Sequence, residues 1–244
     1  MKGASAMDTD SRSEAMTVLV TGAAGNLGRA VAKAFSERGH NLVLIARRRE
    51  DLVAAFADEA ANRAFAAIDL LDPRQVGESV AWAQRRFQRV DVLCNIAGGF
   101  RMGSPVHETT DKDWDFLFDV NVRTLLNCVR AVVPHMIQGG GGKIINVAAA
   151  AAQKGVALMG AYCAAKSVVI RITEAMAAEL RDKKINVNCV LPTIIDTPEN
   201  RSAMPDADPA RWVAPDDLAR VIAFLASNDA RAIHGAAIPV SALS

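Results

Sequence analysis

The stretch that decides the predicted fold is Thr17–Gly28, which reads TVLVTGAAGNLG. A β-branched run over residues 17–20 precedes a glycine-rich turn, and a helical pattern begins near residue 27. Glycine permits a tight bend and a close approach to phosphate, and the following helix offers unpaired N–H groups at its positive end. This order predicts a dinucleotide site, although a glycine-rich turn that binds nothing has the same local pattern. The candidate cofactor-binding residues here are Gly22, Gly25, Asn26, Leu27 and Gly28.

The rest of the chain alternates short apolar runs with helical stretches, which predicts a doubly wound, parallel, seven-stranded sheet of the Rossmann type. Strands are expected near residues 17–21, 41–46, 64–68, 91–95, 143–148, 185–191 and 236–240, and helices near 27–38, 50–61, 73–87, 111–137, 160–182 and 215–227. The four glycines at 139–142 precede a strand, so they indicate a helix end and a turn. A single domain over residues 16–244 is expected, after a disordered tail over residues 1–15.

Tyr162 and Lys166 are the clearest candidates for chemistry. At positions i and i+4 of a predicted helix, their side chains leave the same face about one turn apart. An ammonium beside a phenol favours the phenolate, which predicts a lowered pKa for Tyr162 and a role as general acid/base. A buried tyrosine followed one turn later by a solvated lysine gives the same spacing by chance. The pair indicates a catalytic site only when it is considered together with the glycine-rich turn.

Composition excludes several classes of function. The net charge is +1 and the arginines are mostly dispersed, which disfavours a nucleic-acid partner. No apolar stretch approaches the roughly 18 residues that cross a bilayer, and residues 1–15 lack the apolar core of a signal peptide, so no membrane association and a cytoplasmic location are expected. Cys94, Cys128, Cys163 and Cys189 have no metal-binding spacing, and they are expected to be buried thiols with no metal site.

In their order and spacing, the glycine-rich turn, the segment Asn95–Gly98 and Tyr162-x-x-x-Lys166 resemble the short-chain dehydrogenase/reductase family over residues 16–242. The family's usual turn is Thr-Gly-x-x-x-Gly-x-Gly, and here Asn26 stands at the second of these glycines. The Gly-x-x-Gly-x-x-Gly spacing and the segments 93–100 and 191–212 resemble the branch that contains dihydropteridine reductase. The resemblance implies a hydride-transfer enzyme that uses NAD(P)(H).

Ala149 occupies the position, thirteen residues before the tyrosine, where the wider family has a serine that donates a hydrogen bond to the substrate carbonyl. Loss of one such donor costs on the order of 3 kcal/mol of transition-state stabilisation if nothing replaces it. Three readings remain open: an easily reduced substrate such as a quinonoid ring, a substitute donor from the loop 149–160, or a protein that binds the cofactor without turnover. Gln153 and Lys154 are the nearest polar candidates for a substitute.

The end of the second predicted strand bears on the choice of cofactor. An NAD enzyme is expected to place an acidic residue here, but the chain has Ala46 followed by Arg47 and Arg48. An arginine suits a ribose 2′-phosphate, so NADP(H) is favoured, with Arg47 as first and Arg48 as second candidate, and NAD(H) remains possible. The likeness to dihydropteridine reductase argues for NADH, and a solvated basic turn is the non-functional alternative.

The family resemblance implies further roles by position. Asp69 and Leu70 are expected to contact the adenine of the cofactor. The backbone at Asn95, Ala97 and Gly98 is expected to pass the adenosine ribose. Thr197 is expected to contact the nicotinamide carboxamide. Asn121 is expected to hold a water beside Lys166, unless it only caps or bends its helix. Residues 193–214 are expected to form a lid, and five side chains are candidates for the substrate pocket: Phe100, Arg101, Arg201, Arg211 and Trp212.

The sequence as a whole predicts an NADP(H)-favouring dehydrogenase or reductase that acts on a small carbonyl or quinonoid substrate, with Tyr162, Lys166 and Asn121 as catalytic residues. The alternative is a non-catalytic dinucleotide-binding or redox-sensing protein on the same fold, because the serine is absent. By family resemblance, the long helices 111–137 and 160–182 pack between subunits, which predicts a homodimer or homotetramer.

Overall fold

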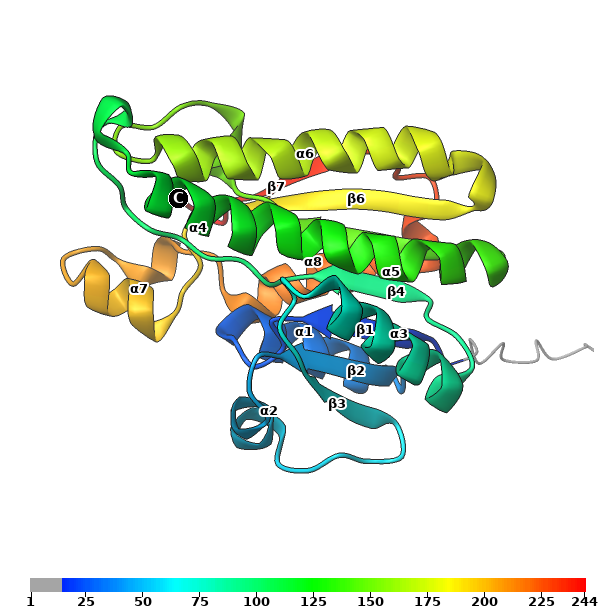
Figure 1. The fold of residues 1–244 in the computed structure, drawn as a ribbon. Coiled ribbons are helices and arrows are strands. Elements are labelled where there is room, and N and C mark those ends of the chain that lie inside the picture. Colours follow the sequence, from blue (N-terminus) through cyan, green and yellow to red (C-terminus); the bar gives the residue numbers. More distant parts are fainter. Residues whose placement is uncertain (1–14) are drawn as a thin grey trace, which may run out of the picture.

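The computed structural model describes residues 15–244, so the expectation of a disordered tail falls almost entirely outside the described residues. Seven strands form one sheet: β1 Thr17–Thr21, β2 Asn41–Ala46, β3 Arg63–Ala67, β4 Val92–Asn95, β5 Gly142–Val147, β6 Ile185–Pro192 and β7 Ala237–Val240. All neighbouring strands pair in parallel, in the order β3-β2-β1-β4-β5-β6-β7 (Figure 1). The predicted Rossmann-type sheet is confirmed.

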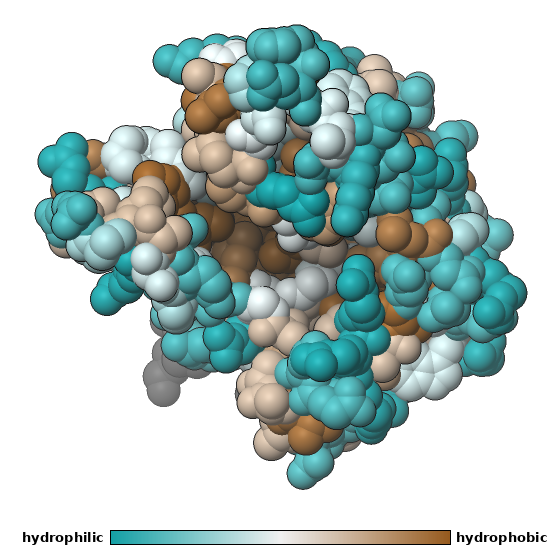
Figure 2. Space-filling view, turned by 60° about the vertical axis from the view of Figure 1, so that its left-hand side comes forward, coloured by the Kyte–Doolittle hydropathy of each residue, from teal (hydrophilic) through white to brown (hydrophobic). Residues whose placement is uncertain are grey.

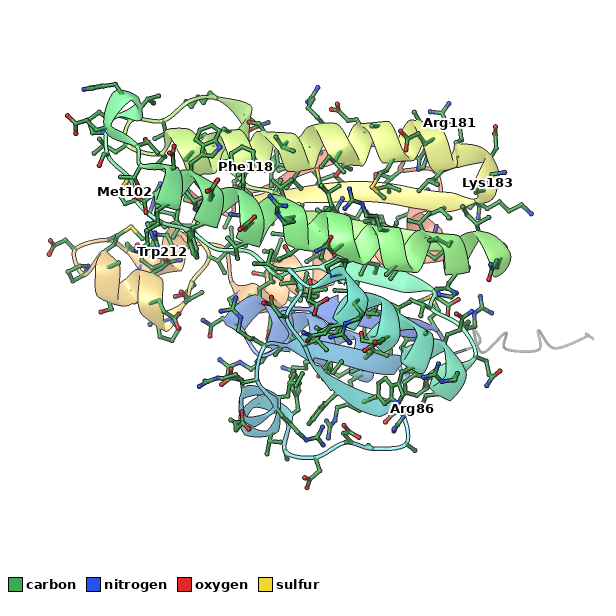
Figure 3. All side chains as sticks on the ribbon, in the orientation of Figure 1. Arg86, Met102, Phe118, Arg181, Lys183 and Trp212 are labelled. Carbon is green, nitrogen blue, oxygen red and sulfur yellow. The ribbon has the colours of Figure 1, made fainter. Side chains whose placement is uncertain are left out.

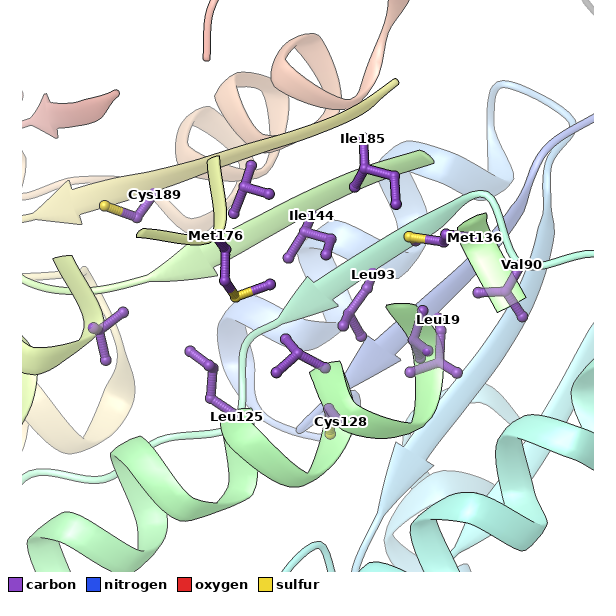
Figure 4. Packing of buried hydrophobic residues seen from close by; sticks show 14 of the residues in the cluster. Leu19, Val90, Leu93, Leu125, Cys128, Met136, Ile144, Met176, Ile185 and Cys189 are labelled. Atoms are coloured by element: carbon purple, nitrogen blue, oxygen red, sulfur yellow. The ribbon is translucent and has the colours of Figure 1, made fainter. Parts of the chain in front are cut away.

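Helices cover both faces of this sheet, as parallel strands require. They are α1 Asn26–Ser36, α2 Arg49–Phe56, α3 Pro73–Phe87, α4 Asp111–Phe118, α5 Thr124–Gln138, α6 Gly160–Leu180, α7 Pro198–Ala203 and α8 Pro215–Ala226. Alternate residues of β1 serve the two faces: Leu19 joins the core under α3, α5 and α6, while Val18 and Val20 join the core under α1 and α8. Figure 4 shows the first of these cores, with Leu93 and Ile144 from the sheet near Leu125 and Cys128 from α5.

Most predicted elements have the expected bounds within two residues, but three regions differ. The helix expected at 111–137 is divided by a π-helical turn, Asp119–Arg123. The second helix ends at Phe56 because Ala57 adopts a positive φ of 61°. The segment 193–214, expected as an irregular lid, contains the short helix α7, which Pro198 begins at its first position.

The glycine run at 139–142 is a helix end and turn, as predicted. Helix α5 ends at Gln138, and β5 begins at Gly142. Gly140 and Gly141 adopt φ values of +83° and +150°, a region that side chains disfavour, so these two positions require glycine. All four cysteines are buried free thiols, also as expected.

Candidate active site

The candidate residues gather at the carboxyl ends of the strands. The strand order reverses between β1 and β4, and a parallel sheet opens a crevice at such a switch point. Figure 2, which turns this end of the molecule forward, shows a central hollow with a brown, hydrophobic floor. The glycine-rich turn after β1, the segment after β4 and the first turn of α6 all lie at this edge of the sheet.

The turn between β1 and α1 is shaped by two glycines that cannot carry a side chain. Gly22 has a φ of +62°, and an added Cβ would lie 2.9 Å from the Cα of Ala97. A Cβ on Gly28 would lie 2.2 Å from the carbonyl oxygen of Gly22, so α1 packs directly on the turn. No side chain caps the start of α1, and its first turn has no acidic residue. The N–H groups there suit an anion such as a pyrophosphate.

Asn26, the departure from the family's glycine pattern, connects this turn to α7 in the segment expected to form a lid. Its Nδ2 donates to Oε2 of Glu199 in α7 at 2.8 Å, although the two residues are 173 positions apart. Nη2 of Arg29 donates to Oδ1 of Asn26 at 2.9 Å and holds the amide in place. Sequence reasoning missed Glu199, because no local pattern indicates which lid residue reaches the turn.

Three consecutive arginines after β2 have different surroundings. Arg48 donates to Asp51, which forms the first turn of α2 with it, and this contact lowers the pKa of Asp51. Arg49 pairs with Glu59 at 3.2 Å. Arg47 is exposed, and no ion-pair or hydrogen-bond partner is found for it among residues 15–244. Of the two candidates for a 2′-phosphate, Arg47 is therefore the one whose guanidinium is not already engaged.

Thr21, at the end of β1, positions the segment after β4. Its Oγ1 accepts hydrogen bonds from the backbone N–H groups of Ile96 and Ala97, both at 3.0 Å. Asn95 points between strands instead, and its Nδ2 donates to Oδ1 of Asn146 at 2.9 Å. Thr21 was not among the predicted site residues, although a hydroxyl at the strand end beside a glycine turn is a signal that could have found it.

The two residues expected at the adenine follow β3, at the same edge of the sheet. Oδ1 of Asp69 accepts from the N–H of Leu71 at 2.9 Å, which shapes a local turn. The carbonyl oxygen of Leu70 accepts from Nδ2 of Asn127 in α5 at 2.9 Å. Both residues are thus fixed by hydrogen bonds after the carboxyl end of β3, and their contact with a cofactor stays a prediction.

Tyr162 and Lys166 lie on α6, with Nζ of Lys166 6.0 Å from the centre of the tyrosine ring. The ammonium donates to the carbonyl oxygen of Val147 at the end of β5, at 2.9 Å. Burial lowers the pKa of Lys166 to about 8. Burial also raises the pKa of Tyr162 to about 12, so the expected lowering of that pKa is wrong for this structure. Desolvation of the phenolate is the main cause of this raised pKa, and the Lys166 ammonium donates to Val147 instead.

Asn121 lies in the π-helical turn, and its side chain reaches the site. Nδ2 donates to the carbonyl oxygens of Leu117 and Gly99, each at 2.9 Å, and Oδ1 accepts from the N–H of Gly99 at 3.1 Å. A Cβ added to Gly98 would lie 2.9 Å from Oδ1 of Asn121 and 3.2 Å from Nζ of Lys166. Gly98 thus leaves open a small space that both polar atoms face.

Ala149 brings no hydroxyl to the site. It is buried in extended backbone before a short 3-10 turn, Ala150–Gln153, that packs on α6. Gln153 and Lys154 are exposed, and neither lines the small cavity beside Tyr162. The structure therefore gives no support to either residue as the substitute donor.

The candidate pocket residues divide into two groups. Phe100 meets the ring of Tyr162 edge to face, and Arg101 lines the adjacent cavity. The lid residues do not line this cavity: Arg201 forms a two-pronged ion pair with Asp196, at 2.6 and 2.7 Å, and Trp212 is buried. Arg211 donates to the carbonyl oxygen of Leu243 near the carboxyl terminus.

Thr197, expected at the nicotinamide, begins the lid helix. Its hydroxyl accepts from the N–H of Asn200 at 3.2 Å, so it is the N-cap of α7. Whether it also serves the carboxamide stays a prediction.

Comparison with known proteins identifies the family. A sequence model of the family described as short chain dehydrogenase matches residues 16–208. The chain belongs to the short-chain dehydrogenase family. D-threitol dehydrogenase from Mycolicibacterium smegmatis is 33% identical to this short-chain dehydrogenase over 244 aligned positions, which cover 94% of this chain and 93% of the relative.

Two solved structures show the same fold with different nucleotides. ElxO with bound NADP has a TM-score of 0.87 and 26% identity, covering 93% of this chain and 97% of ElxO. Carveol dehydrogenase from Mycobacterium avium in complex with NAD has a TM-score of 0.86 and 26% identity, covering 95% and 98%. Family membership makes this short-chain dehydrogenase an NAD(P)-dependent oxidoreductase of carbonyl or alcohol substrates.

Over residues 15–244, no group of three or more His, Cys, Asp or Glu side chains is arranged to hold a metal ion. In the same part of the chain, no helix has both the length and the apolar character that spanning a membrane requires.

Proposed function

We propose that this chain is an NADP(H)-dependent dehydrogenase or reductase in which Tyr162 exchanges a proton with the substrate oxygen. The observation that carries the proposal is the meeting of Tyr162, Lys166 and Asn121 at the crevice beside the uncapped first turn of α1. The residues fit a dinucleotide: the turn after β1 approaches closely because of its glycines, and Arg47 is free to meet a phosphate. When bound, the nicotinamide supplies or accepts the hydride.

The chain's own residues supply the proton. The pKa of Tyr162, raised to about 12, keeps its phenol protonated at neutral pH, which suits donation to the oxygen of a carbonyl during reduction. Burial lowers the pKa of Lys166 to about 8, so this lysine gives up a proton more readily than a solvated lysine and can pass it onward. Asn121 faces the same small space beside Gly98 and holds that space in shape.

The substrate proposal takes account of Ala149. Either a quinonoid ring, which is reduced without strong support of its oxygen, or an ordinary ketone or alcohol is compatible with the family. The named relative D-threitol dehydrogenase supports an alcohol or ketone by its name, and the missing hydroxyl supports the quinonoid ring and the dihydropteridine reductase branch. We keep both within one proposal, because a single assay distinguishes them.

That assay measures NADPH and NADH oxidation with quinonoid dihydropterin, an o-quinone, a diketone and an acetoacetyl thioester, with Ala149→Ser in parallel. Turnover by the unaltered protein is expected, and Tyr162→Phe should reduce kcat by at least about a hundredfold while cofactor affinity stays within about twofold. Unchanged turnover in Tyr162→Phe would remove Tyr162 from the mechanism.

NADP(H) as the preferred cofactor depends on Arg47. Arg47→Ala is expected to weaken NADPH binding by about 10- to 100-fold and to leave NADH binding nearly unchanged, because only NADPH has the 2′-phosphate. Arg48→Ala is the matched control, since Arg48 is engaged by Asp51. If both substitutions, or neither, change the ratio of the two affinities, the assignment fails.

A second candidate function is favoured by Ala149 itself. A protein that binds the dinucleotide without turnover, as a carrier or redox sensor, needs no oxyanion donor. It predicts tight NADPH binding, no oxidation with any substrate, and carbonyl reduction that appears only in Ala149→Ser. The panel described above decides between this candidate and the enzyme.

Domain organisation, location and subunit assembly complete the proposed function. We propose that residues 16–244 form one nucleotide-binding domain that acts in the cytoplasm. We also propose that α4 and α5, which span the expected helix 111–137, and α6 pack between subunits in a homodimer or homotetramer. Light scattering on the purified protein tests the last point, because a monomer at micromolar concentration would contradict it.

A further inference from the structure

Large apolar side chains are unusually exposed on two loops beside Tyr162. One loop joins β4 to α4 and the other joins β5 to α6. Among residues 15–244, these loops hold five of the eleven large hydrophobic residues that are exposed. We call them the apolar rim: Phe100 at 53% exposure, Met102 at 58%, Val106 at 73%, Val156 at 39% and Leu158 at 46%.

The two loops are joined to each other, so the rim is one surface. The N–H of Gly103 donates to the carbonyl oxygen of Leu158 at 2.8 Å. A Cβ added to Gly160 would lie 2.8 Å from Cγ2 of Val106, so the start of α6 packs directly against the first loop. Figure 3 places Met102 at the end of the molecule where α7 and the start of α6 also lie, which is the hollowed side in Figure 2.

Phe100 connects the rim to the reacting group. Its ring meets the ring of Tyr162 edge to face, with centroids 5.0 Å apart and an interplanar angle of 86°. About half of Phe100 nevertheless remains exposed. When a carbonyl approaches the Tyr162 hydroxyl, the group bonded to it would therefore meet the exposed apolar ring of Phe100.

The cation beside Phe100 is not free to attract an anionic substrate. Arg101 pairs with Asp113, and its guanidinium also lies over the ring of Phe116, 4.2 Å from the centroid. The contact with Arg101 lowers the pKa of Asp113, so the pair stays charged and mutually neutralised. Ala149, without a hydroxyl, adds no polar group on the other side. The five side chains of the apolar rim offer no hydrogen bond, so substrate hydroxyls packed against them would be left without partners there, which is costly.

We propose that Phe100 is a specificity-determining residue, and that the substrate's carbonyl is bonded to an uncharged apolar group, preferably an aromatic ring, that packs on Phe100 and the apolar rim. This inference rests on the proposed function, because it assumes that Tyr162 serves that carbonyl. It excludes two classes of substrate: polyols and ketoses, and substrates whose anionic group would have to bind at the apolar rim.

The test compares two diketones that differ at one end, 1-phenyl-1,2-propanedione and 2,3-butanedione, with NADPH as reductant. The unaltered protein is expected to favour the phenyl compound at least about tenfold in kcat/KM. Phe100→Ala should bring that ratio close to one by raising KM, with kcat changed less than about threefold. Phe224→Ala is the matched control, because Phe224 is a similarly exposed phenylalanine, 46%, on α8.

A ratio near one in the unaltered protein, or a ratio that survives Phe100→Ala, overturns the proposal. A second measurement separates it from the proposed function: saturation-transfer NMR of 1-phenylethanol and of D-threitol on the protein without cofactor. If neither diketone is reduced but 1-phenylethanol binds and loses binding in Phe100→Ala, the proposed reaction fails while the packing of an aromatic group on Phe100 is confirmed. If 2,3-butanedione is reduced equally well and 1-phenylethanol does not bind, the reaction stands and the inference fails.

Discussion

Replacing Lys166 with methionine tests the electrostatics of the site through stability alone. A solvated lysine has a pKa near 10.5, and burial lowers that of Lys166 to about 8. Between pH 8 and pH 10.5, Lys166 holds its proton in the unfolded chain but has released it in the folded chain. The contribution of Lys166 to the free energy of unfolding therefore increases as the pH rises. Below pH 8 both states are protonated, and the buried charge costs about 3 kcal/mol, at about 1.4 kcal/mol for each tenfold change.

Methionine has a similar length and does not titrate. The free energy of unfolding of the natural protein, minus that of Lys166→Met, should therefore rise by about 2 kcal/mol between pH 7 and pH 9.5. Lys166→Met also loses the hydrogen bond to Val147. The cost of that loss changes the size of the difference in unfolding free energy, but it does not produce the rise of this difference with pH.

Urea unfolding followed by circular dichroism at pH 7, 8, 8.75 and 9.5 gives the required free energies. Lys154→Met, at an exposed loop position, is the control and should follow the natural protein across the whole range. Parallel pH profiles for the natural protein and Lys166→Met would mean that Lys166 keeps its proton through pH 9.5, and the reasoning from burial would be refuted.

Three other substitutions test how the crevice is built. Gly28→Ala should destabilise the fold by at least about 3 kcal/mol, or prevent folding, because its Cβ would lie 2.2 Å from the oxygen of Gly22; a thermal melt close to that of the natural protein would contradict this packing. Thr21→Val should cost about 1–3 kcal/mol in urea unfolding, because two backbone N–H groups lose their acceptor. Asn26→Gly restores the family's usual residue and removes the contact with Glu199; stopped-flow fluorescence should show NADPH leaving about three- to tenfold faster, and an unchanged rate would mean that this contact does not hold the lid.

The sequence predicted the parts of the site whose geometry is local. The spacing of Tyr162 and Lys166 places them on one face of a helix, wherever that helix lies in the fold. Contacts between distant segments were beyond its reach. It also could not show, even over three residues, that Arg48 is tied to Asp51 while Arg47 remains free, because such pairing depends on side-chain conformations that spacing does not fix.

The pKa of Tyr162 illustrates the same limit. The neighbouring lysine is visible in the sequence, and by itself it predicts a lower value. The larger effect is burial, which depends on all the segments that pack around the ring, including Phe100 from a loop 62 positions earlier. The direction of the shift was therefore decided by packing.

The amino-acid sequence by itself determined the order of strands and helices, the glycine turn and the family, because apolar periodicity and glycine's conformational range act over a few residues. Tertiary structure alone decided the bond between Asn26 and Glu199 and the exposure of the apolar rim. These features arise where parallel strands end together, so they join segments that are far apart in the chain. A local sequence pattern determines on which face of a helix or strand a side chain lies. Only the packed fold determines which residues that side chain contacts.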